Sequence, residues 1–96
     1  MELTGQTVIV AAKDQVSCDL TGEAMILSLK RGMYYSLDPV GASIWKLLER
    51  PVAIADIRDA LLEEYDVGRS RCESDLHEFL RQLAAEGLIE VRESRH

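Results

Sequence analysis

Few side chains in this sequence are spaced for catalysis. Two histidines and two cysteines occur among the 96 residues. Nucleophilic catalysis requires a base beside a serine, cysteine or threonine, but His77 lies within an expected helix among acidic residues and His96 is the last residue. The residue pattern therefore predicts a protein that is not an enzyme.

The same side chains are poorly spaced for a metal ion. Cys72 and His77 are five positions apart, so on a helix they point to different faces, whereas metal ligands use the shared face of an i,i+4 pair. Cys18 and Cys72 have no CxxC partner, and we expect both to be buried free thiols. Because no glycine-rich phosphate loop occurs either, we expect no metal ion and no cofactor.

Composition and charge narrow the class of partner. Apolar residues make up 47% and charged residues 29% of the chain, which is typical of a folded domain, and the length predicts a single domain over residues 1–96. Eleven basic against 17 acidic residues give a net charge of -6, which repels phosphate backbones and argues against nucleic acid. No run approaches the roughly 18 apolar residues of a membrane span, and no signal peptide is evident. We therefore expect a cytoplasmic protein.

The first third of the chain is typical of short strands. The β-rich runs are TVIVA, QVSCDL, EAMILSL and MYYSL, with Gly22 and Gly32 at positions expected for hairpin turns. In the third run, Met25, Leu27 and Leu29 alternate with Ala24, Ile26 and Ser28. The pattern predicts an antiparallel meander of about three strands, with residues 33–37 as an edge strand.

This predicted edge strand lacks the usual protection. Sheet edges are normally blunted by charge or proline, and residues 33–37 contain neither. Tyr35 should face the same side as Met33 and Leu37, whereas Tyr34 and Ser36 should face the other side. One tyrosine can then join the core while its neighbour stays open, or both rings can anchor the strand to the helices.

Two helices should follow this strand. Asp38 and Pro39 occupy typical N-cap and first-turn positions. A stripe of apolar residues continues the first helix until Pro51, with Trp45 on its shoulder: Val40, Ile44, Leu47 and Leu48. A second helix carries Ile54, Ile57, Leu61 and Tyr65 and ends at the run DVGRS; Ala53 before it provides no capping oxygen.

A third helix is predicted over residues 70–86. Ser70 and Glu73 match a capping box, and Gly87 followed by Leu88 matches a C-cap. Its apolar stripe consists of Cys72, Leu76, Phe79, Leu80 and Leu83. With a short final strand in LIEV, the order of elements indicates an α+β fold, a winged helix-turn-helix with a three-stranded antiparallel sheet packed on three helices.

A winged helix is often a DNA-binding fold, so a DNA-binding or regulatory module is one alternative function. The exposed positions of the third helix argue against DNA binding, because three of the five are acidic and would meet phosphates. These positions are Arg71, Glu73, Asp75, Glu78 and Arg81. A second alternative is a dimer that pairs the edge strand with its own copy.

Three stretches of the sequence resemble the PqqD family, the leader-peptide recognition domains of pathways that make ribosomally synthesised and post-translationally modified peptides. The stretches are LSLKRGMYYSLDPVGASIWKLL, IADIRDALLEEYDV and CESDLHEFLRQLAAEGLIEV, which span roughly residues 15–91. They contain the patterns G-x-Y-Y-x-L-[DN]-x-x-G-x-x-[IL]-W and D-[LV]-x-x-F-L-x-x-L…G-L-I in order. Within the family, the sequence is most similar to free-standing members of lasso-peptide pathways.

The resemblance implies that a leader peptide adds as a further antiparallel strand between residues 33–37 and the third helix. The implied strand contacts are Met33, Tyr34, Tyr35, Ser36 and Leu37, and the implied apolar floor is Cys72, Leu76, Phe79 and Leu83. Asp75 matches the family's helix aspartate and would accept a hydrogen bond from the leader, unless it only pairs with Arg71. Lys30 and Arg31 would either meet acidic leader residues or stay solvated.

The resemblance also implies the mechanism and the partners. A domain that holds the leader raises the effective concentration of the tethered core peptide at a processing enzyme and needs no catalytic residue. In a lasso pathway this enzyme would be a cysteine-protease-like leader peptidase, working alongside an ATP-dependent cyclase. In a pyrroloquinoline-quinone-type pathway it would be a radical S-adenosylmethionine enzyme.

Overall fold

The computed structural model describes residues 3–20 and 23–92. In this part of the chain the strands are β1 (Val8–Ala11), β2 (Gln15–Leu20), β3 (Glu23–Ser28), β4 (Met33–Leu37), β5 (Val52–Ala53) and β6 (Ile89–Arg92). The helices are α1 (Pro39–Leu47), α2 (Ile54–Glu64) and α3 (Arg69–Ala85). The α+β class and the three helices confirm the predicted fold class.

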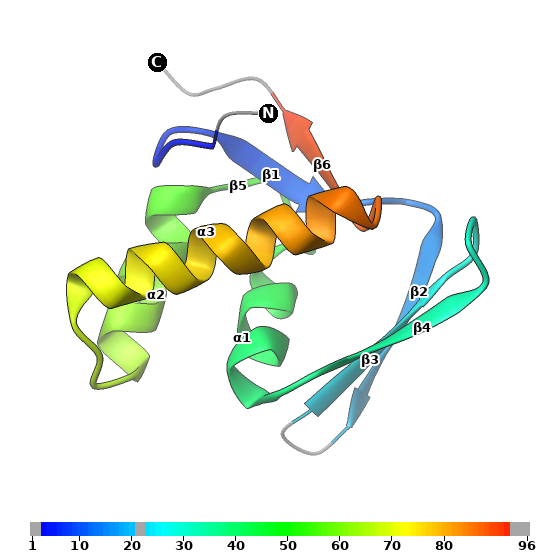
Figure 1. The fold of residues 1–96 in the computed structure, drawn as a ribbon, viewed down its shortest axis with the longest axis horizontal. Helices are drawn as coiled ribbons and strands as arrows, with labels where there is room; N and C mark the ends of the chain where they lie inside the picture. The colour runs from blue at the N-terminus through cyan, green and yellow to red at the C-terminus, as the bar shows by residue number, and fades with distance from the viewer. Residues whose placement is uncertain (1–2, 21–22, 93–96) are drawn as a thin grey trace.

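The described strands form two antiparallel sheets, ordered β5-β1-β6 and β2-β3-β4. α3 crosses one face of the molecule over α1 and α2, and the β2-β3-β4 sheet lies beyond its C-terminal end (Figure 1). The predicted meander corresponds to β2, β3 and β4. The second sheet was not predicted, because β1 pairs with the distant β6 and with the two-residue β5. The expected turn at Gly22 lies outside the described residues.

The start of α1 confirms the predicted cap. Asp38 is the N-cap residue, and its Oδ1 accepts a hydrogen bond from the main-chain N–H of Gly41 at 2.7 Å. Pro39 occupies the first turn, where its missing N–H breaks no helical bond. Because Asp38 directly follows β4, the edge strand leads into α1 at this cap.

Both ends of α3 were predicted, but only the C-terminal signal was correct. The helix begins at Arg69 with Gly68 as N-cap and no side-chain cap bond, so the capping box at Ser70 was wrong. Glu73 instead accepts hydrogen bonds from Arg69 and Arg58. At the other end, Gly87 adopts a φ of 73°, and the N–H of Leu88 donates to the carbonyl of Leu83 at 2.9 Å, as a glycine C-cap requires.

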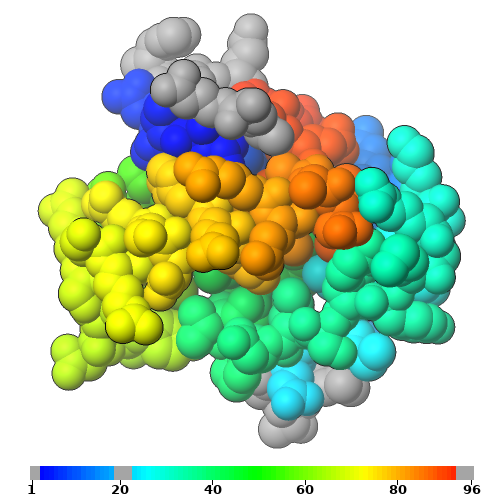
Figure 2. Space-filling view, in the orientation of Figure 1, coloured from blue at the N-terminus to red at the C-terminus, as the bar shows by residue number. Residues whose placement is uncertain are grey.

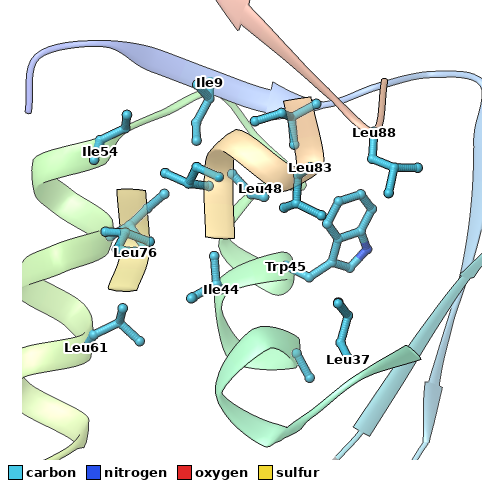
Figure 3. Close-up of a cluster of buried hydrophobic side chains, with 14 of the residues drawn as sticks. Ile9, Leu37, Ile44, Trp45, Leu48, Ile54, Leu61, Leu76, Leu83 and Leu88 are labelled. Atoms are coloured by element: carbon cyan, nitrogen blue, oxygen red, sulfur yellow. The ribbon is translucent and has the colours of Figure 1, made fainter. Parts of the chain in front are cut away.

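The core lies between the helices and the inner faces of both sheets (Figure 3). Its fully buried side chains come from β1, β3, α2, α3 and the segments that directly follow α1 and α3: Ile9, Ile26, Leu48, Ile54, Ile57, Leu76, Leu80 and Leu88. The stripe predicted for α1 is rotated: Trp45 is 5% exposed and belongs to the core, whereas Val40 and Leu47 are exposed. The small residues Gly41 and Ala42 are buried instead, because α1 packs closely against its neighbours.

Within residues 3–20 and 23–92, no helix combines the length and the apolar character that crossing a bilayer requires.

Candidate functional site

β4 is an edge strand whose outer main-chain groups are open. The main-chain groups of β3 point alternately to β2 and β4, and Leu29 at the end of β3 donates to the carbonyl of Asp14 on the β2 side at 3.0 Å. The alternate residues therefore point to β4, where the register pairs Ser28, Ile26 and Ala24 with Met33, Tyr35 and Leu37. This alternation leaves the N–H and C=O groups of Tyr34 and Ser36 on the open edge.

The side chains of β4 alternate as predicted. Tyr34 is 68% exposed and Ser36 is exposed, whereas Tyr35 is half-buried and Leu37 is buried in the core. Tyr35 is therefore the tyrosine that joins the interior, and the alternative in which both rings anchor the strand is wrong for Tyr34. Met33, at the start of the strand, is 50% exposed.

Tyr35 also connects β4 to the end of α3. Its hydroxyl donates to Glu86 Oε2 at 2.7 Å. Arg31 donates to the same oxygen at 3.1 Å and to the carbonyl of Ala85 at 3.2 Å. The hydrogen bond to the Glu86 carboxylate, together with desolvation, raises the pKa of Tyr35, because a phenolate would lie beside a second negative charge.

An apolar pocket begins where β4 ends. Its volume is about 370 Å³, and it lies between α1, α3 and the C-terminal part of α2 with the segment that follows it. At its near end a Cβ atom on Gly41 would lie 3.4 Å from the Cβ of Leu37 and 3.4 Å from the ring of Phe79, so the strand end, α1 and α3 meet there. Figure 2 shows this face, with α1 in green below α3 in yellow and orange and β4 in teal beside them.

Two carboxylates lie in the lining of this apolar pocket. Asp38 uses Oδ1 for the helix cap, and Asp75 lies 3.6 Å from Arg71 in an exposed i,i+4 pair. Burial, with Asp75 and Glu73 nearby, raises the pKa of the Cys72 thiol. The pocket can therefore hold an apolar side chain and offer acceptors at its rim to a hydrogen-bond donor.

The structure brings most of the predicted site residues to this region. Cys72, Asp75, Leu76 and Phe79 line the pocket. Leu83 is 5% exposed and packs in the core near Trp45 (Figure 3), so it lies beneath the site. Six further lining residues were not predicted as part of a binding site: Val40, Gly41, Ile44, Leu61, Tyr65 and Val67. The sequence predicted four of them, Val40, Ile44, Leu61 and Tyr65, only as members of the apolar stripes of α1 and α2.

The remaining chemical predictions concern cysteines and metal ions. Cys72 is buried as expected, but Cys18 is exposed, because it lies on the outer face of an edge strand rather than in the core. In the described ranges, no three residues among the histidines, cysteines, aspartates and glutamates are placed to share a metal ion.

Comparison with known proteins identifies the family. Residues 23–89 match the family described as Coenzyme PQQ synthesis protein D (PqqD), which is more than half of the chain. The chain belongs to the PqqD family. This PqqD-family protein also matches the solved structure “TbiB1 in Complex with the TbiA(beta) Leader Peptide”, with a TM-score of 0.80 and 41% sequence identity over 84% of this chain and 94% of the other. No curated protein matches the sequence.

Proposed function

We propose that this PqqD-family protein is a non-catalytic recognition protein that binds the leader of a ribosomally made precursor peptide. The observation that carries this proposal is the open edge of β4 ending at an apolar pocket. An extended peptide can pair with such an edge and place alternate side chains in pockets. The similarity to TbiB1, whose structure contains a leader peptide, supports the same class of ligand.

The leader adds as an antiparallel strand between β4 and α3. Tyr34 and Ser36 supply the main-chain donors and acceptors, because their N–H and C=O groups lie on the open edge. Tyr35 and Leu37 form the inner wall beneath the peptide, and exposed Met33 lies at the start of the strand. The apolar floor is formed by Cys72, Leu76 and Phe79, with Leu83 supporting it from the core.

Charged residues fix the orientation of the peptide at both ends of this site. Asp75 accepts a hydrogen bond from the leader at the pocket, at the expense of its weak exposed pair with Arg71. Lys30 is exposed in the turn before β4 and meets acidic leader residues. Arg31 beside it is already bound to Glu86, so Lys30 is the freer of the two cations.

The protein acts by tethering the core peptide rather than by reacting with it. Holding the leader raises the local concentration of the core at a processing enzyme. We infer a cysteine-protease-like leader peptidase as this enzyme, in a lasso-peptide pathway, with a radical S-adenosylmethionine enzyme as the alternative.

We place the protein in the cytoplasm, and its unpaired cysteines fit a reducing compartment. Residues 1–96 act as one domain, supported by a single core cluster from Leu3 to Ile89.

A fluorescence-polarisation titration tests the proposal. The probe is a labelled leader peptide encoded by a short precursor gene beside the gene of this protein, and a scrambled leader of the same composition is the control. We expect saturable binding of the true leader only, with a dissociation constant in the order of 0.01 to 10 μM for a strand interface with side-chain pockets. Equal binding of both peptides, or binding of neither, would contradict leader recognition.

A further inference from the structure

The contact between Arg31, Tyr35 and Glu86 joins two parts of the chain that are otherwise loosely connected. β4 pairs with β3 along its whole length and leads into α1, whereas its contacts with α3 are few. The hydroxyl of Tyr35 and the guanidinium of Arg31 both donate to Glu86 Oε2, at 2.7 and 3.1 Å. This three-residue cluster, called the clasp below, thus connects the two walls between which the leader is proposed to lie.

The position of Glu86 is unusual for a residue that only stabilises a helix. It is the C-cap residue of α3, where the partial negative charge of the helix end disfavours a carboxylate. Arg31 compensates for this by donating both to Glu86 and to the carbonyl of Ala85. The pair is also exposed, with 48% and 38% of the two side chains accessible, so its contribution to global stability is small.

We propose that Glu86 is a positioning residue that holds the β4 edge at the correct distance from α3 for leader binding. This inference rests on the proposed leader-recognition function. In the free protein the clasp fixes the hairpin that carries β4 against α3, so that the open main-chain groups of Tyr34 and Ser36 and the pocket at Phe79 are aligned before the leader arrives. Preorganisation of this kind raises affinity because less ordering is required on binding.

A positioning role of the clasp and a direct contact between Arg31 and the leader predict different results for a double variant. If Arg31 acts only by holding Glu86, the loss of Glu86 already removes the effect of Arg31, and removing both residues costs no more than removing Glu86 alone. If Arg31 instead meets an acidic leader residue, its loss adds to the loss of Glu86. Residues that act as a unit are non-additive in a double-mutant cycle, whereas independent contacts add.

The experiment measures leader affinity by fluorescence polarisation for Glu86→Ala, Glu86→Gln, Arg31→Gln and the Arg31→Gln/Glu86→Gln double variant. We expect Glu86→Ala to weaken binding by about tenfold, which corresponds to about 1.4 kcal/mol. Glu86→Gln keeps an acceptor for Tyr35 and loses only the charge, so we expect a loss of about threefold, with the double variant equal to the weaker single variant. Thermal midpoints should remain close to that of the unsubstituted protein.

Glu78→Gln is the matched control. Glu78 is an exposed acid in α3, so this substitution removes one negative charge from the same helix without touching the clasp. It should bind the leader like the unsubstituted protein. Equal affinity of the unsubstituted protein and Glu86→Ala, or additive losses in the double variant, would overturn the clasp while leaving leader recognition intact. Absence of leader binding by the unsubstituted protein would overturn the proposed function itself and the role of the clasp with it.

Discussion

Substitution of Ser36 by proline separates strand addition from a binding mode that uses side chains alone. The N–H of Ser36 lies on the open edge of β4, and proline removes this donor without breaking a bond to β3. Proline is tolerated in edge strands at such positions. It also restricts the preceding residue to extended conformations, which Tyr35 already adopts in β4. The Ser36→Pro protein should therefore fold.

The expected loss of affinity follows from one main-chain hydrogen bond. The net contribution of such a bond is about 0.5 to 1.5 kcal/mol, which corresponds to roughly twofold to tenfold in the dissociation constant. The pyrrolidine ring also projects towards the incoming strand, so the observed loss should lie at the upper end of this range or above it. Ser36→Ala removes the hydroxyl but keeps the N–H, and it should bind the leader more tightly than Ser36→Pro.

Fluorescence polarisation with the labelled leader gives the affinities, and circular dichroism verifies that each variant is folded. A folded Ser36→Pro protein that binds the leader as tightly as Ser36→Ala would refute strand addition along β4. The pocket would then have to bind the leader without main-chain pairing, and the open edge would need a different explanation.

Three further predictions concern the elements around the site. Asp38→Ala removes the cap bond to Gly41, so we expect about 1 kcal/mol lower stability and a thermal midpoint about 4 to 8 °C lower in calorimetry, with Asp38→Asn retaining most of it. Gly41→Ala gains about 1 kcal/mol of helix propensity but places a Cβ atom 3.2 Å from the capping oxygen Asp38 Oδ1 and 3.4 Å from the ring of Phe79, so we expect the gain to be offset, with nearly unchanged stability in denaturant titrations and weaker leader binding. In an alkaline absorbance titration, Tyr35 should ionise above the ordinary tyrosine pKa, and Glu86→Gln should return it towards that value, because the carboxylate no longer opposes the phenolate; identical titrations would show that the contact does not form in solution.

Local signals in the sequence were sufficient for the elements that build the site. Asp38 and Pro39 predicted the start of α1, because aspartate can accept a hydrogen bond from a free N–H of the first turn and proline lacks an N–H where none is bonded. Gly87 predicted the end of α3, because glycine readily adopts the positive φ of a helix C-cap. The alternation in residues 33–37 predicted that the two tyrosines face opposite sides, since a strand places successive side chains on opposite faces, but it did not predict which of them turns inward.

Contacts between distant segments were beyond these local signals. The pairing of β1 with β6 joins the two ends of the described chain, and the residue pattern of neither strand indicates which strand it pairs with. The bond from Tyr35 to Glu86 spans 51 positions and depends on where α3 ends relative to β4. At Ser70 a local signal was present but misleading. The residues match a capping box, yet the helix already begins at Arg69, with Gly68 as its N-cap.

The motif from Gly32 to Trp45 can be explained residue by residue in physical terms. Gly32 adopts a φ of 66° in the turn before β4, and Trp45 anchors α1 in the core. Between them, the inner side chains of β4 are used by the fold: Leu37 is buried, and Tyr35 reaches the end of α3. The outer main-chain groups of the strand and the exposed side chain of Tyr34 remain unused by the fold, and neither charge nor proline protects this edge. An unprotected edge favours aggregation unless a partner strand occupies it, so the same features that complete the fold favour an edge kept open for a peptide.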